Sequence, residues 1–174
     1  MKKFSILFTV LFAVSLVAIA AQKKEGPSRS TKAKPAEAST TEQHVILTPA
    51  DFKWGDAPPS LPPGAKMAVL SGDPGKKGLF TVRFQMSAGY KVPPHTHPTA
   101  EYVTVISGVL YVGAGDKFDE AAGKQLEAGS YVVMPAGMTH YVWSRGETEI
   151  QINSMGPFEI KYANPADDPR NAKK

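Results

Sequence analysis

The stretch GYKVPPHTHPTAEYVTVISG, residues 89–108, contains the side chains around which the rest of the chain can be arranged. His95 and His97 are two residues apart, and residues two apart on an extended strand point to the same face. Glu101 follows a Pro-Thr turn and begins a second strand pattern with alternating valines. Two imidazoles and a carboxylate that converge on one point are ligands for a borderline divalent metal. The stretch therefore predicts a metal site where two strands meet.

A third histidine ligand is expected from the second half of the chain. Residues 129–140 read GSYVVMPAGMTH, and their glycine and proline turn signals predict a hairpin that returns His140 toward the first pair. The chain has four histidines, and the remaining one, His44, lies outside both stretches beside a polar segment. We expect His44 to be a solvated surface residue.

The two stretches resemble the paired motifs of the cupin superfamily. The first motif is matched at every spacing by Gly89, His95, His97, Glu101 and Gly108. The second is matched by Gly129, Pro135, Gly137 and His140, with Ser144 in place of its final asparagine. The resemblance covers roughly residues 45–162. It implies a small single-domain cupin with a cupin-type double-stranded β-helix, and a divalent metal held by the four ligands His95, His97, Glu101 and His140.

The hydrophobic pattern independently predicts an all-β, jelly-roll barrel. Residues 79–87 alternate, with Phe80, Val82, Phe84 and Met86 on one face, which is typical of a half-buried strand. About nine or ten such short strands, separated by turn residues, fit a double-sheet architecture. We also expect a strand at 45–47, a tight hairpin at Gly108, and one helical turn within 116–123.

Strand parity predicts what surrounds the site. If His140 points inward, Val142 and Ser144 should too, while Tyr141 and Trp143 face away. Val103 and Val105 should line the interior beneath Glu101. The walls predicted in this way are mostly apolar, so no charged group indicates a substrate. Outward-facing aromatic rings would expose apolar surface in a monomer, and we therefore expect a homodimer.

Composition limits the partners and the chemistry. The chain has 174 residues, enough for one domain with a proper core. Its net charge is +4, and the seven basic and three acidic side chains of residues 1–43 account for all of it. A neutral globular part does not predict a nucleic-acid partner. The chain has no cysteine, which excludes disulfides, thiolate ligands, a cysteine nucleophile and a lipid-anchoring cysteine.

The N-terminal region predicts secretion. Lys2 and Lys3 precede an apolar run at 4–18 and small residues at an A-x-A site, so 1–20 is expected to be a signal peptide cleaved after Ala20. The protein would then be periplasmic or secreted, with no membrane attachment after cleavage; the alternative is an uncleaved anchor. Residues 21–43 are polar and Pro-rich and predict a disordered linker. The cupin domain is expected at 44–164, and a polar C-terminal tail at 165–174.

Three nitrogens and one carboxylate oxygen suit Fe, Mn, Ni, Co or Zn as the divalent metal. Glu101 has two interpretations, a metal ligand or a carboxylate base, and no residue is assigned a catalytic role. We expect a metal-dependent enzyme acting on a small molecule, dioxygenase-like or with other cupin chemistry. The alternative is a non-catalytic metal-dependent binding or sensor module, as in single-domain cupins similar to the cupin half of certain anti-sigma factors. A structural or storage role would not need the full ligand set.

Overall fold

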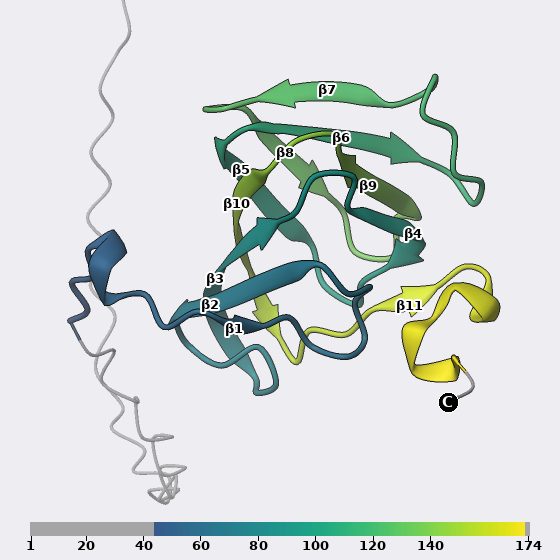
Figure 1. The fold of residues 1–174 in the computed structure, drawn as a ribbon. Helices are drawn as coiled ribbons and strands as arrows, with labels where there is room; N and C mark the ends of the chain where they lie inside the picture. The colour runs from purple at the N-terminus through teal and green to yellow at the C-terminus, as the bar shows by residue number, and fades with distance from the viewer. Residues whose placement is uncertain (1–43, 173–174) are drawn as a thin grey trace, which may run out of the picture. The chain divides into compact units, whose positions relative to one another are not determined.

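The computed structural model describes residues 44–172, which form eleven strands and three short 3-10 turns (Figure 1). The strands are β1 (Gly55–Asp56), β2 (Ala65–Ser71), β3 (Gly78–Met86), β4 (Lys91–Thr96), β5 (Glu101–Ser107), β6 (Val109–Ala114), β7 (Lys124–Glu127), β8 (Tyr131–Met134), β9 (His140–Ser144), β10 (Thr148–Gly156) and β11 (Lys161–Tyr162). The 3-10 turns are η1 (Pro49–Asp51), η2 (Pro165–Asp167) and η3 (Pro169–Asn171). The predicted signal peptide and linker, 1–43, lie outside the described residues.

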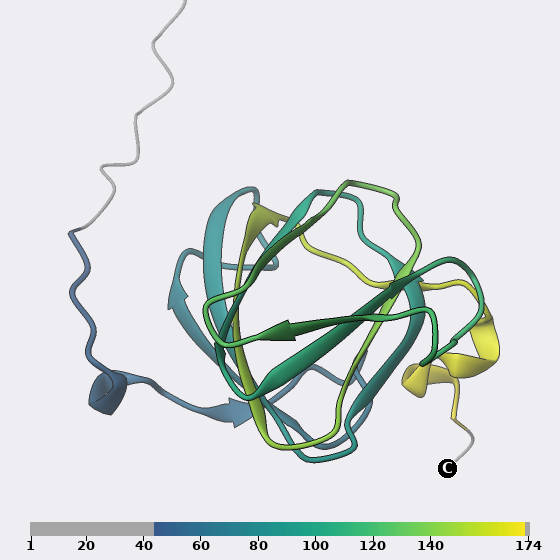
Figure 2. The ribbon, with the colours of Figure 1, turned by 90° about the horizontal axis from the view of Figure 1, so that it is seen from above.

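The strands form two sheets that face each other and enclose the core. The six-stranded sheet has the order β1-β2-β3-β10-β5-β8 and the five-stranded sheet the order β11-β4-β9-β6-β7. Every pairing among the described strands is antiparallel. Seen from above, the strands of this part of the chain enclose a barrel (Figure 2). The predicted all-β jelly roll is confirmed.

Period-two alternation explains how β3 separates the core from the surface. Phe80, Val82 and Met86 are buried on the inner face of the sheet, as predicted. The outer-facing residues find polar partners on β10, where Thr81 Oγ1 donates to Asn153 Oδ1 at 2.8 Å. This division buries the apolar face between the sheets, which is the main favourable contribution to folding.

The chain passes from one sheet to the other at Gly108, so the predicted hairpin there is wrong. β5 pairs with β10 and β8, whereas β6 pairs with β9 and β7. Gly108 has φ 73° and its Cα faces the backbone of Glu147 and Thr148 so closely that a Cβ would clash. A glycine is needed because it combines a positive φ with this close approach.

Two further local expectations are also wrong. Residues 45–47 are exposed and form no strand. Residues 116–123 contain no helical turn. The short apolar run at 45–47 fits a strand or a loop locally, and in the structure no neighbouring strand pairs with it. The polar run at 116–123 fits a helical turn or a loop.

The segment 115–123, here called the 115–123 loop, covers the outer face of the five-stranded sheet. Its Phe118 packs against Tyr141 and Trp143, at ring-centroid distances of 4.9 and 5.4 Å. Tyr141 Oη also donates to the Asp119 carbonyl at 2.9 Å. The two rings face away from the site, as parity predicted, but each is only 1% exposed. The expectation that they form an exposed dimer surface is therefore wrong.

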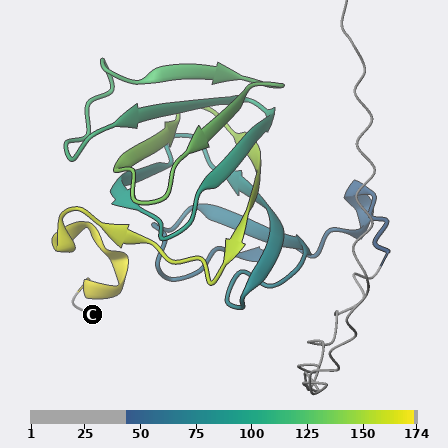
Figure 3. The ribbon, with the colours of Figure 1, turned by 180° about the vertical axis from the view of Figure 1, so that it is seen from behind.

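The C-terminal residues follow β11, the edge strand of the five-stranded sheet, which pairs with β4 (Figures 1 and 3). Here η2 and η3 form successive turns, and Arg170 Nη2 donates to the Ile160 carbonyl at 3.3 Å. The polar segment expected at 165–174 is thus folded against the barrel as far as the structure describes it. Among residues 44–172, no helix has the length and apolar character needed to cross a membrane.

Candidate metal centre

The fold brings all four predicted site residues to one cavity between the sheets. His95 lies near the end of β4 and is the register partner of His140, the first residue of β9. His97 follows β4 directly, and Glu101 begins β5. The ligand nitrogens of the three histidines lie within 4.8 Å of one another. The motif spacing thus identified residues that converge in space.

A backbone hydrogen bond joins the two motifs at the site. Gly137 N donates to the His97 carbonyl at 2.9 Å, and Gly137 has φ 74°. The strands on either side of this turn, β8 and β9, belong to different sheets, so the predicted hairpin before His140 is instead a crossing between sheets. His140 still returns to the first pair because β9 pairs with β4.

Backbone carbonyls select one tautomer for all three imidazoles. The Nδ1 atom of His95 lies 2.7 Å from the Pro93 carbonyl oxygen, and the Nδ1 atom of His97 lies 2.7 Å from the Glu159 carbonyl oxygen. The Nδ1 atom of His140 lies 3.0 Å from the Met138 carbonyl oxygen. A carbonyl oxygen only accepts, so each Nδ1 must carry the proton and donate. Each Nε2 therefore keeps its lone pair for a ligand, the arrangement found around metal-binding histidines.

The surroundings of His140 Nε2 indicate that the lone pairs gathered at this site fit a cation. This atom is buried, and within the described part of the chain it has no hydrogen-bond partner. Its nearest charged neighbour is Glu101 Oε2 at 3.3 Å, and the same oxygen is 3.7 Å from His97 Nε2. In the tautomers set by the backbone, these atoms are all acceptors and repel one another unless a cation lies among them. A divalent metal would satisfy the buried acceptors, whose unpaired state is otherwise costly.

The protonation states also favour ligation. Burial, together with the neighbouring His140 and His97, lowers the pKa of His95 to about 3. Burial likewise lowers the pKa of His97. Both rings are consequently neutral near pH 7, the form that binds a metal.

Glu101 remains ionised despite its burial. Burial acts to raise the pKa of its carboxyl, but the contact with His140 and the nearby His97 lower that pKa below its ordinary value, an effect that requires positive charge, from a proton or a metal, among these atoms. Glu101 lies beside the three-histidine cluster and is 6% exposed. Its position allows both predicted roles, metal ligand and carboxylate base.

The segment after β10 supports His97 in a way that the sequence did not reveal. The ring of Phe158 stacks on the imidazole of His97, with centroids 4.2 Å apart and planes at 14°. Phe158 also meets Phe80 edge-on at 5.2 Å, which anchors it to the core. The adjacent Glu159 contributes only its carbonyl. Neither contact belongs to a motif, and a backbone acceptor leaves no signal in side-chain patterns.

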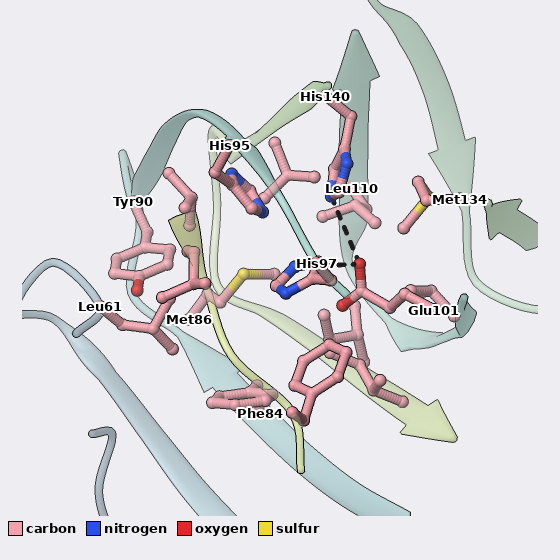
Figure 4. A pocket seen from close by; sticks show the side chains of 17 residues that line it. Leu61, Phe84, Met86, Tyr90, His95, His97, Glu101, Leu110, Met134 and His140 are labelled. Atoms are coloured by element: carbon pink, nitrogen blue, oxygen red, sulfur yellow. Dashed lines mark ion pairs between the residues drawn. The ribbon is translucent and has the colours of Figure 1, made fainter. Parts of the chain in front are cut away.

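The four predicted ligands form one wall of an apolar cavity of about 70 Å³ (Figure 4). Val103 and Val142 line it, as parity predicted. The other apolar lining residues are Leu61, Phe84, Met86, Val92, Leu110, Met134, Ile150, Ile152, Phe158 and Ile160. The volume is several times the roughly 10–15 Å³ that one water needs, so a small molecule fits beside the ligands.

Two facing antiparallel sheets with a histidine cluster between them define the protein as a cupin. It belongs to the ChrR Cupin-like domain family, whose model matches residues 42–159. The resemblance inferred from the two motifs is therefore confirmed.

The chain is also similar to part of several plant germin-like proteins. It is 37% identical to germin-like protein subfamily 1 member 1 of Arabidopsis thaliana over 68 residues, which are 38% of this chain and 31% of that protein. It is 36% identical to subfamily 1 member 7 over 94 residues, 49% of this chain and 41% of that protein. The chain thus spans less than half the length of these relatives.

Solved structures share the fold. A polyketide cyclase from Streptomyces resistomycificus superposes with a TM-score of 0.62 at 15% identity, over 73% of this chain and 90% of that one. A proposed acetylacetone dioxygenase from Methylibium petroleiphilum superposes with a TM-score of 0.58 at 18% identity, over 76% and 90%. At these identities the similarity establishes the architecture alone.

Proposed function

We propose that the protein is a metal-dependent enzyme that acts on a small molecule. The divalent transition metal would be held by His95, His97, His140 and Glu101. The observation that carries the proposal is the common tautomer of the three imidazoles, which directs every Nε2 lone pair into one buried cavity. A structural site would be closed, whereas this one adjoins a cavity that can admit a ligand.

When bound, such a metal would supply Lewis-acid or redox chemistry to a small molecule beside it. The imidazoles are fixed in orientation because a backbone carbonyl accepts a hydrogen bond from each Nδ1, and burial lowers the pKa of His95 and His97 so that these two rings stay neutral. Glu101 supplies the negative charge of the site, and its oxygen is positioned next to two of the imidazoles. The apolar walls exclude bulk water and strengthen every electrostatic interaction inside the cavity. An oxygen-dependent reaction on a small organic molecule suits these features best.

Two measurements test this function. Metal analysis of protein from its native compartment should give one Fe, Mn, Ni, Co or Zn ion per chain. Oxygen consumption by the loaded protein should then rise with a small carbonyl compound. Protein that takes up no divalent metal after dialysis against each ion would contradict the metal centre, and a loaded protein that binds but never turns over such compounds would identify a binding module instead.

The role of Glu101 is tested separately. We propose that it is a ligand, because its oxygen is the only anionic atom among the described residues that reaches two of the imidazole Nε2 atoms. Glu101→Gln keeps the size of the side chain and removes its charge. It should weaken metal binding by about tenfold or more. Unchanged metal affinity with lost turnover would instead identify Glu101 as the carboxylate base.

We also propose that the protein is exported and that the mature chain begins at Ala21. The support is the Lys2-Lys3 start, the apolar run and the A-x-A site. N-terminal sequencing of the protein from its native host should find Ala21 in the periplasmic or secreted fraction. A retained Met1 in a membrane fraction would contradict cleavage.

A homodimer is proposed on a different surface from the one first expected. Tyr102, Tyr131 and Val133 are 41, 59 and 40% exposed. They lie together on β5 and the edge strand β8, where Tyr102 is the register partner of Val133. Exposed apolar residues on an edge strand favour pairing with a second chain. Light scattering should give the dimer mass for the wild type and the monomer mass for Tyr131→Glu; a wild-type monomer would contradict the proposal.

A further inference from the structure

The lining of the cavity limits which ligands the metal centre can accept. Among the 17 lining residues that the structure describes, 12 are apolar and none is lysine or arginine. The polar lining residues are the three histidines, Glu101 and Tyr90. Burial raises the pKa of Tyr90 to about 12, so its hydroxyl stays neutral. Its Oη donates to the Pro62 carbonyl at 3.1 Å, and this bond uses its only proton.

The charge balance of the site follows from these residues. Three neutral imidazoles and one carboxylate leave one positive charge of a divalent ion uncompensated. A ligand with one negative charge would cancel it, but a dianion or a phosphate ester would bring an excess charge into an apolar cavity with no cationic side chain to pair it. Burying an unpaired charge in such surroundings is strongly unfavourable.

A proline-rich strap, residues 57–64, is fixed to the barrel and contributes one residue, Leu61, to the cavity lining. Two buried tyrosines hold the carbonyls of the residues on either side of Leu61, because Tyr162 Oη donates to Ser60 O at 2.8 Å and Tyr90 Oη donates to Pro62 O. Leu61 lies between these anchors and its side chain lines the cavity. In Figure 4, Leu61 and Tyr90 lie on one side of His97 and Glu101 lies on the other. Leu61 is therefore placed to limit the length of a ligand that reaches the metal ligands.

We propose that the site accepts a small, largely apolar carbonyl compound that carries no more than one negative charge, and that Leu61 determines its maximum size. The proposal rests on the proposed metal centre. The ligand would place its oxygen atoms toward the histidines and Glu101, and its apolar remainder against the valine, leucine and isoleucine walls. Burial of that remainder supplies binding energy in proportion to its apolar area.

Substitution of Leu61 tests whether the missing cationic side chain excludes dianions. The fold should tolerate the change, because Leu61 is only partly buried and lies outside the strands. The probes are 2,4-pentanedione and oxalate, which each present two oxygens but differ in charge. Protein whose nickel content has been measured is titrated with each probe by calorimetry. The wild type should bind the diketone more tightly, and Leu61→Arg should shift the ratio of the two dissociation constants toward oxalate by about tenfold or more. Leu79→Arg is the matched control, because Leu79 is 61% exposed on β3 and outside the lining, and it should leave the ratio unchanged.

A second variant tests the size limit. Leu61→Ala should tighten the binding of the longer heptane-3,5-dione by about tenfold relative to 2,4-pentanedione, since one methylene in an apolar pocket is worth at least that much. A nickel-loaded wild type that prefers oxalate, or a ratio that Leu61→Arg does not move, would overturn this inference and leave the metal centre intact. If nickel does not load, the same titrations are made with whichever of Fe, Mn, Co or Zn does; failure to load any of these ions would overturn the proposed function and this inference together.

Discussion

His95 and His140 face each other directly across the β4–β9 pairing, with ring centroids 4.3 Å apart. The two residues are 45 positions apart in the chain, and the register of two antiparallel strands alone makes them neighbours. The proposed metal centre thus depends on the correct pairing of the five-stranded sheet.

This relationship predicts the effect of removing one ligand. His140→Ala deletes a side chain that faces the cavity and should leave the barrel folded. It removes one of three nitrogens, so metal affinity should fall by about 100-fold or more. Metal content by mass spectrometry and circular dichroism of the same sample measure both effects. His44→Ala is the control, because His44 is exposed and lies away from the cavity. Full metal content in His140→Ala would show that the ligand set is wrong.

The stability of the metal-free protein should fall as the pH is lowered. In the unfolded chain His95 takes up a proton near its ordinary pKa of 6.5, whereas in the folded protein it stays neutral down to about 3. Between these values unfolding binds a proton, so lower pH favours the unfolded state. The lowered pKa of Glu101 also makes the folded protein less stable at lower pH, in the most acidic part of the range.

Urea unfolding of metal-free protein at a series of pH values from about 7 to about 4 measures this dependence. The midpoint should decrease steadily, and His95→Asn should flatten the part of the curve below pH 6.5. A midpoint that rises on acidification would contradict the neutral, buried state assigned to His95.

Phe158 should affect both stability and metal binding. Phe158→Ala removes a half-buried ring that stacks on His97 and contacts Phe80, and it should cost about 2 kcal/mol of stability. Because His97 loses its support, metal affinity should fall as well. The control is Phe52→Ala. The ring of Phe52 packs against Arg83, with its centroid 5.2 Å from the guanidinium carbon. That variant should lose stability without a change in metal affinity. Equal metal affinity in both variants would show that the stacking does not position His97.

The packing of the 115–123 loop predicts the consequence of a single methyl group. A Cβ at Gly123 would overlap the ring of Trp143, which is 1% exposed and has no room to move. Gly123→Ala should therefore cost about 1–3 kcal/mol. Gly146→Ala is a close control, since a Cβ there meets nothing within 4 Å. Thermal unfolding should show a lower midpoint for the first variant alone, and equal midpoints would contradict the packing.

Local pattern was sufficient to predict the architecture and the residues of the candidate centre. Alternation with a period of two identified the inner face of β3, because side chains on a strand point to opposite faces. The same rule placed Val103 and Val142 on the cavity wall, and Tyr141 and Trp143 away from it. Motif spacing identified the three histidines that cluster, together with Glu101 beside them.

The contacts that complete the site depend on tertiary structure. The turn signal at Gly108 predicts a hairpin wrongly, because such a signal does not specify which sheet the next strand joins. Trp143 was expected at the surface because no local pattern shows that Phe118, from a distant loop, covers it.

The amino-acid sequence by itself determined the all-β class, the four residues at the centre and the apolar character of its walls, because these follow from residue type and short-range spacing. Only the tertiary structure decided the tautomers of the imidazoles, the stacking of Phe158 on His97 and the position of Leu61 over the cavity. Each of these depends on backbone carbonyls or loop residues that are distant in the chain, and their partners are chosen by the register of the sheets and the path of the loops.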